Sequence, residues 1–153
     1  FPETIPTHLR EHFSVTAEDY RFDTVLMGRR TYEVGLAQGV ESPYQHLKQY
    51  VFSATLVDRP DSGVELVRSD ALEFVRDLKQ RSGQDIWLCG GGELASSLFG
   101  EIDELIIKSN PFLMGRGKGL FEHSVSSAEL ALISREDYSN GVSVLRFAVP
   151  HGG

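Results

Sequence analysis

Short runs of apolar residues alternate with helical patterns along the first two thirds of the chain. The runs are four to six residues long and stop at glycine or polar residues, which is typical of buried strands. They lie at residues 24–27, 49–53, 64–67, 86–89 and 104–109. Apolar residues at helical spacing predict helices over 7–13, 29–36 and 70–81, and a further helix that starts near residue 92. Asp70, with Glu73 three residues later, is a capping-box-like start for the third of these.

The last third of the chain contains extended patterns without helices. Two runs, 130–134 and 142–149, flank Ser139-Asn140-Gly141, which favours a hairpin turn. Strands that alternate with helices form parallel sheets covered on their faces, whereas consecutive strands pair antiparallel. The pattern therefore predicts an α/β fold with three α/β/α layers around a mixed, mostly parallel sheet and an antiparallel C-terminal hairpin.

The composition is that of one ordinary globular domain spanning residues 1–153. Hydrophobic residues make up 41% of the chain and charged residues 24%, and no apolar stretch approaches the roughly 20 residues of a membrane span. No signal-peptide pattern is present at the start. The net charge of −7 argues against a nucleic-acid surface, which needs clustered basic residues.

Cysteine and histidine give little support for metal or disulfide chemistry. Cys89 is the one cysteine, so no intrachain disulfide is possible and a reducing, cytoplasmic setting is favoured. Cys89 closes an apolar strand and is interpreted as structural, with a nucleophilic role as the alternative. Only His8 and His12 stand at i,i+4 spacing, and no further ligand completes a set, so no metal site is predicted.

The motif DIWLCGGGELASSLF, residues 85–99, is the most informative stretch for function. A strand pattern stops at Gly90, Gly91 and Gly92 and passes directly into a helical pattern. Glycine lets the backbone turn sharply and lets a ligand approach it, and the helix start presents free N–H groups. The combination predicts an anion site of the kind that holds phosphates, with an ordinary tight turn as the alternative.

A second strand-to-helix turn, VLMGRRTYE at residues 25–33, resembles the first. Gly28 ends the strand, and Arg29, Arg30 and Thr31 form the first helical turn. Two arginines there oppose the helix dipole, which suggests that an anion completes the site, because guanidinium groups bind phosphate bidentately. The alternative is that both arginines pair with surface carboxylates.

Both glycine turns are expected at the carboxyl ends of strands, where open α/β sheets bind their ligands. Two phosphate sites on one sheet edge suit a dinucleotide. The G-x-G-x-x-G fingerprint and the P-loop are both absent, so neither of those two frameworks would hold it.

Four motifs in this order, VLMGRRTYE, YVFSATL, IWLCGGGELASSLF and NPFLMGRGKGLF, resemble the dihydrofolate reductase-like superfamily. The most similar branch is the reductase domain at the C-terminus of the bifunctional riboflavin-biosynthesis deaminase–reductase, together with its stand-alone relatives. The resemblance covers nearly the whole chain. It implies a dihydrofolate reductase-like mixed sheet, NADPH as the cofactor and a homodimer.

The resemblance also implies roles for individual residues. The pyrophosphate would be held by Gly90, Gly91, Gly92, Glu93 and Leu94. The adenosine phosphates would be faced by Gly28, Arg29, Arg30 and Thr31, and the adenine ribose would be flanked by Ser53, Ala54 and Thr55.

The substrate side departs from the family pattern. Family members normally begin with an S-L-D-G-like strand that lines the substrate and nicotinamide pocket, and this strand is expected to be missing before Phe1. His8 stands where the folate enzyme has an acidic residue, which argues against a true folate reductase. His8 is a candidate proton donor or substrate ligand, with an exposed or capping histidine as the alternative. Arg116 and Lys118, in the glycine loop, are candidate ligands of a substrate phosphate or simply solvated cations.

The implied activity is an NADPH-dependent reduction of a small heterocyclic or ribosyl/ribityl substrate, similar to that of 5-amino-6-(5-phosphoribosylamino)uracil reductase. Hydride transfer demands mainly orientation from the protein, because the cofactor carries the hydride. No catalytic residue is identified. The alternative is a non-catalytic NADP- or nucleotide-binding module that has lost the reductase chemistry. No deaminase zinc signature is present.

Overall fold

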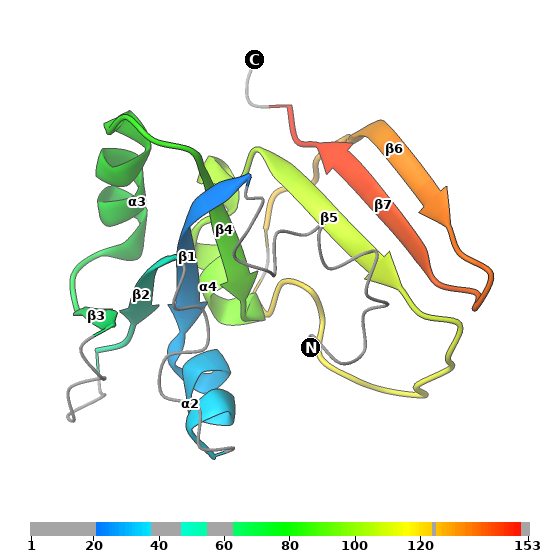
Figure 1. The fold of residues 1–153 in the computed structure, drawn as a ribbon, viewed down its shortest axis with the longest axis horizontal. Coiled ribbons are helices and arrows are strands. Elements are labelled where there is room, and N and C mark those ends of the chain that lie inside the picture. The colour runs from blue at the N-terminus through cyan, green and yellow to red at the C-terminus, as the bar shows by residue number, and fades with distance from the viewer. Residues whose placement is uncertain (1–20, 38–46, 55–62, 124, 151–153) are drawn as a thin grey trace.

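Four parallel strands form the first sheet of the computed structural model, which describes residues 21–37, 47–54, 63–123 and 125–150. The strands are β1 (Phe22–Gly28), β2 (Lys48–Phe52), β3 (Val64–Val67) and β4 (Asp85–Gly90), in the order β3-β2-β1-β4 (Figure 1). All four were predicted from their apolar runs. The helix predicted over 7–13 lies outside the described residues.

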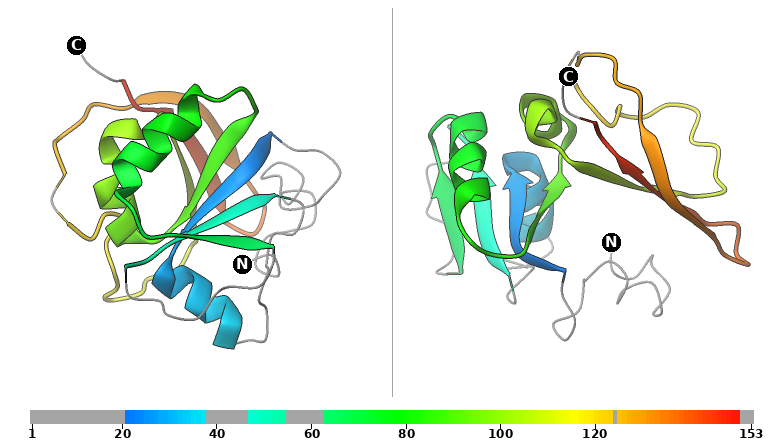
Figure 2. Two further views of the ribbon diagram at one scale, coloured as in Figure 1. Left: turned by 90° about the vertical axis from the view of Figure 1, so that its left-hand side faces the viewer. Right: turned by 90° about the horizontal axis from the view of Figure 1, so that it is seen from above.

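Helices cover both faces of this sheet, which confirms the predicted three layers. Helix α2 (Arg29–Ala37) lies on one face, and α3 (Ala71–Gln80) and α4 (Gly92–Ser97) lie on the other (Figure 2, left). The alternation along β1 explains this arrangement, because successive side chains of a strand point to opposite faces. Val25 and Met27 pack with Tyr32 of α2, whereas Leu26 packs with Leu94 and Leu98 on the other side.

Helix α3 begins where the sequence predicts, because Asp70 caps it. The Asp70 carboxylate accepts hydrogen bonds from the N–H groups of Leu72 at 2.9 Å and Glu73 at 3.3 Å. Val75 is the buried residue of the helix, and the ring of Phe74 meets Tyr50 and Phe52 edge to face. A short 3₁₀ helix, η2 (Phe99–Glu101), follows α4.

Three antiparallel strands form a second sheet, in the order β5-β7-β6. They are β5 (Glu104–Ser109), β6 (Ala131–Asp137) and β7 (Ser143–Ala148). The predicted hairpin joins β6 to β7, and Gly141 supplies the positive φ, 88°, that its turn requires. The α/β class is confirmed, but within the described residues the antiparallel strands form a sheet of their own and are not an edge of the parallel one.

No helix in the described part of the chain is long and apolar enough to cross a membrane.

Candidate functional site

The two glycine turns lie side by side at one edge of the parallel sheet. Strands β1 and β4 are hydrogen-bonded neighbours, and Met27 pairs with Gly90. A Cβ on Gly28 would stand 3.5 Å from the Gly91 nitrogen and 3.6 Å from the Gly90 oxygen. The sequence-based expectation that both turns share one edge therefore agrees with the topology.

Thr31 of α2 lies over the turn at Gly90 and Gly91. Its hydroxyl oxygen is 3.6 Å from a Cβ built on either Gly90 or Gly91, and among the described residues nothing else comes within 4 Å of those two positions. Gly90 has a φ of 144°, which side-chain-bearing residues rarely adopt, and the Gly90–Gly91 peptide is cis. The space around the Cβ positions of Gly90 and Gly91 leaves this backbone open to a ligand, with the Thr31 hydroxyl beside it.

Gly92 is in a different environment, because the protein's own backbone covers it. A Cβ on Gly92 would lie 3.1 Å from the Gly119 oxygen, the Leu120 oxygen and the Glu122 nitrogen. The Glu122 N–H donates to the Gly92 carbonyl at 3.1 Å. Gly92, expected to bind pyrophosphate, thus has a packing reason to be glycine, independent of any ligand.

Both arginines of α2 have carboxylate partners, as in the alternative interpretation of the sequence. Arg29 Nε lies 3.7 Å from Glu33 Oε1, and Arg30 Nη1 lies 3.4 Å from Glu122 Oε1. The two arginine side chains are 41% and 60% exposed, so these ion pairs are solvated and weak. Such pairs leave the guanidinium groups able to exchange a carboxylate for another anion.

The remaining predicted cofactor residues differ in where they lie and in how exposed their side chains are. Ser53 and Ala54 follow the end of β2, whose Phe52 pairs with Gly28, so they lie at the same sheet edge. Glu93 is exposed in the first turn of α4, whereas the Leu94 side chain is buried in the core. Helix α4 has six residues, so the dipole at its start is smaller than that of a long helix. Thr55 lies outside the described residues.

The predicted substrate residues are less well supported. His8 lies outside the described residues. Arg116 and Lys118 are both exposed in the loop of residues 115–119, which contains three glycines, and of the two only Lys118 borders a large hollow.

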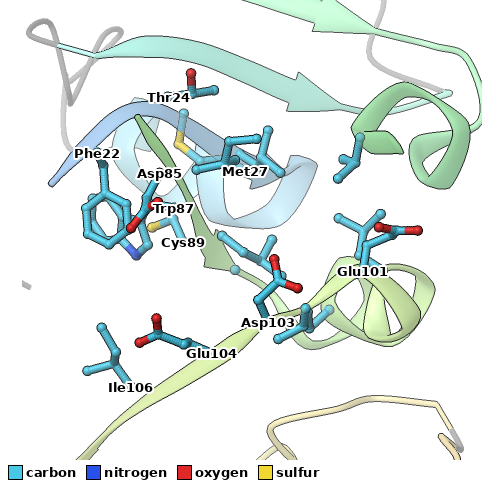
Figure 3. Close-up of a pocket in the computed structure, with 18 of the residues that line it drawn as sticks. Phe22, Thr24, Met27, Asp85, Trp87, Cys89, Glu101, Asp103, Glu104 and Ile106 are labelled. Carbon is cyan, nitrogen blue, oxygen red and sulfur yellow. The ribbon is translucent and has the colours of Figure 1, made fainter. Parts of the chain in front are cut away.

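This hollow, of about 1220 Å³, lies between the two sheets and reaches the glycine turns. It is bounded mainly by β1, β4, β5 and the segment 118–121. Phe22, Trp87 and Cys89 form one of its walls, and Glu104 and Ile106 lie across from them (Figure 3). The rings of Phe22 and Trp87 are 6.2 Å apart.

Sequence reasoning did not assign Phe22, Trp87 or Ile106 to a site. The available signal was alternation: Trp87 and Cys89 stand two residues apart on β4 and so share one face of the strand. Both pack at the margin of the core around Val25 and Met27, and both line the hollow. Cys89 is therefore half-buried at the hollow's wall, in an apolar setting.

An ion-pair network lines the hollow where β4 and β5 begin. Glu104 accepts hydrogen bonds from Arg146, at 3.2 Å from its Nη2, and from Arg21, at 2.7 Å. Arg21 Nε also lies 2.7 Å from Asp85. The hydrogen bond from Arg146 and the charge of Arg21 hold the pKa of Glu104 below its usual value. Glu104 is therefore an ionised carboxylate near neutral pH, unsuited to donate a proton.

The fold and this edge define an α/β domain with glycine turns at the carboxyl ends of adjacent parallel strands. A family model described as the RibD C-terminal domain matches residues 10–144. The chain therefore belongs to the RibD C-terminal domain family, and the family resemblance seen in its four motifs is confirmed.

Individual relatives agree with this placement. The uncharacterized protein YwjB of Bacillus subtilis (strain 168) is 34% identical over 124 residues, which cover 80% of this chain and 71% of YwjB. A crystal structure of a putative riboflavin biosynthesis protein from Shewanella sp. PV-4 superposes with a TM-score of 0.76 at 24% identity, covering 99% of this chain and 84% of the other.

A second solved structure comes from a longer protein. The diaminohydroxyphosphoribosylaminopyrimidine deaminase/5-amino-6-(5-phosphoribosylamino)uracil reductase of Thermotoga maritima superposes with a TM-score of 0.63 at 15% identity. The match covers 84% of this chain and 46% of that one. At these identities the two structures establish the fold. The family and the fold together make this a reductase-like domain.

Proposed function

We propose that this chain is an NADPH-dependent oxidoreductase that reduces a small heterocyclic or ribosyl/ribityl substrate. The observation that carries the proposal is the meeting of two glycine turns and two exposed arginines at one edge of the parallel sheet. Ligands of open α/β sheets bind at the carboxyl ends of the strands. The Thermotoga maritima neighbour is named as a 5-amino-6-(5-phosphoribosylamino)uracil reductase, which is consistent with this class of reaction.

The residues at the edge fit a dinucleotide. Phosphate can approach the backbone at Gly90 and Gly91, because only the Thr31 hydroxyl stands near the Cβ positions of that turn among the described residues. Arg29 and Arg30 can take the place of water around a phosphate, since their present partners are exposed carboxylates. Ser53 and Ala54, at the neighbouring strand end, would flank the adenine ribose. NADPH supplies the hydride when it is bound.

The hollow between the sheets would hold the substrate. It begins at Gly90–Gly92 and continues along the side chains of Phe22, Trp87 and Ile106, which offer apolar surface to a flat ring. Lys118 borders the same hollow and could meet a substrate phosphate. These residues orient the substrate beside the cofactor and reduce its contact with water.

A titration with NADPH and NADH tests the proposal. The chain's single tryptophan, Trp87, lines the hollow, so its fluorescence should respond to ligand, and the melting temperature should rise because ligand binds the folded state. Gly91→Val should abolish the response, since its side chain would occupy the place of the phosphate. Gly100→Val is the matched control, because nothing described lies within 4 Å of its Cβ position.

The titration can contradict the proposal in two ways. No response of wild type to either nucleotide at millimolar concentration would remove the nucleotide site altogether. An unchanged affinity in Gly91→Val would remove the pyrophosphate from this turn.

A non-catalytic nucleotide-binding module is the second candidate, and one observation favours it. Glu104, the acidic side chain that faces Trp87 across the hollow, is held ionised by two arginines and does not supply a proton. NADPH binding without NADPH oxidation, across a panel of pyrimidine and ribosylamine substrates, would select this candidate.

The proposal includes a cytoplasmic homodimer. Three consecutive apolar side chains, Phe112, Leu113 and Met114, are 76%, 93% and 72% exposed. Exposed apolar runs of this kind mark contact surfaces in many proteins, which supports a second copy as the partner.

A further inference from the structure

An ion pair joins the start of α2 to the segment 119–123, which covers the start of α4 at the proposed cofactor edge. Arg30 belongs to the first turn of α2, and its Nη1 atom lies 3.4 Å from Glu122 Oε1, 92 residues further along the chain. Glu122 stands at the start of α4, because its N–H donates to the Gly92 carbonyl. The pair therefore connects the start of α2 to the segment that is bonded to Gly92.

The backbone around Glu122 is fixed by several contacts. The His123 N–H donates to Ser96 Oγ at 2.9 Å, and Ser96 Oγ donates to the same Gly92 carbonyl at 2.7 Å. The backbone of Gly119, Leu120 and Glu122 lies against Gly92 with no room for a side chain. These contacts hold the backbone of Glu122 beside the start of α4, and its carboxylate can leave Arg30 by rotation of its own side chain.

We propose that Glu122 competes with a phosphate group of the nucleotide for Arg30 and thereby lowers the affinity for the cofactor. The inference rests on the proposed function. A guanidinium holds a phosphate through two parallel hydrogen bonds, which is a stronger interaction than one contact of 3.4 Å. The displaced carboxylate stays tethered beside the bound phosphate and repels it, so nucleotide binding has to overcome both effects.

Glu33 does not have this role, although it pairs with the other arginine. Arg29 and Glu33 are one helical turn apart on α2, so their ion pair stays along one helix. Glu122, by contrast, pairs with Arg30 from the segment that is bonded to the first residue of α4.

The test is the dissociation constant of NADPH and NADH for Glu122→Gln, measured by the fluorescence of Trp87. The variant should bind about 1.5- to fivefold more tightly, the range expected when an exposed competing ion pair is removed. NADH carries only the pyrophosphate, and NADPH adds the 2′-phosphate. Tightening of both assigns the competition to the pyrophosphate, and tightening of NADPH alone assigns it to the 2′-phosphate.

Two comparisons isolate the ion pair from the change in net charge. Glu129→Gln changes the charge by the same amount at an exposed position before β6, and it should leave both constants unchanged. In an Arg30→Gln background, Glu122→Gln should no longer tighten binding, because the interaction energy belongs to the pair.

Unchanged or weaker binding by Glu122→Gln, or an equal gain in Glu129→Gln, overturns the inference. If wild type binds nucleotide while Glu122→Gln gains nothing, the inference fails and the proposed function stands. If wild type binds neither nucleotide, both fail.

Discussion

At the scale of single residues, three successive glycines have three different environments. Gly90 has a positive φ, Gly91 faces open space beside Thr31, and Gly92 lies under the backbone of Gly119 and Leu120. The sequence GGG predicts a turn that ligands can approach, which describes Gly91 best. It could not separate the three, because the segment that covers Gly92 lies about thirty residues away in the sequence.

Gly92→Ala should destabilise the protein by roughly 1–3 kcal/mol, the range of an overpacked site. The added methyl would lie 3.1 Å from three backbone atoms, so the segment 119–122 would have to move. Gly100→Ala should cost nothing, since its Cβ position is open. Urea unfolding of both variants measures the difference, and equal stabilities would show that the segment gives way easily.

At the scale of elements, the presence of each strand was predicted better than the residues at which it begins and ends. The continuous apolar run at 24–27 marks the centre of β1, because both of its faces are buried. Strand β6 was predicted over 130–134 but extends to Asp137. The prediction stopped early because most side chains of this strand are exposed, and the charged residues Arg135 and Asp137 break the apolar pattern. The contact of Arg30 with Glu122 was not predictable, as nothing local in the sequence links residues 92 positions apart.

The ion pairs of Glu104 with Arg146 and Arg21 should make the free energy of unfolding depend on pH. The pKa of Glu104 is lowered in the folded protein, chiefly by the hydrogen bond from Arg146, so its contribution is present above its unfolded pKa, near 4.5. The contribution is lost as the pH falls through the lower folded value. Wild type should therefore exceed Glu104→Gln in stability at pH 6, and the gap should shrink towards pH 3.

Chemical unfolding at several pH values between 6 and 3 measures that gap. A gap that stays constant over this range would show that the Glu104 charge is not what links β5 to β7 and to Arg21.

At the scale of the whole molecule, the proposed cofactor site lies on the parallel sheet, and the proposed substrate site lies between the two sheets. The parallel sheet and its helices carry the glycine edge, and the antiparallel sheet provides the far wall of the hollow (Figures 1 and 3). The α/β class followed from sequence periodicity, and the shared edge of the two glycine turns followed from the two strand–glycine–helix motifs. The hollow did not, because it depends on how the two sheets face each other, and neither sheet's local pattern contains that information.

The loop that follows β5 is held at Pro111 and again over residues 119–123, and the stretch between these two contacts is exposed. Pro111 packs against the turn at Gly141, and the backbone of 119–123 is bonded to α4. Arg116 and Lys118 lie between these two anchors, so trypsin should cut there in the folded protein. The two pieces should then elute together in gel filtration, because β5 remains paired with β7 across the cut.

Mass spectrometry of the cut protein should find a fragment that begins at Gly117 or Gly119, and Arg116→Gln with Lys118→Gln should prevent its formation. Pieces that separate without denaturant would contradict the double anchoring. If the two pieces stay together, the cut protein can be reassembled from separate fragments. A labelled C-terminal fragment can then be combined with an unlabelled N-terminal fragment.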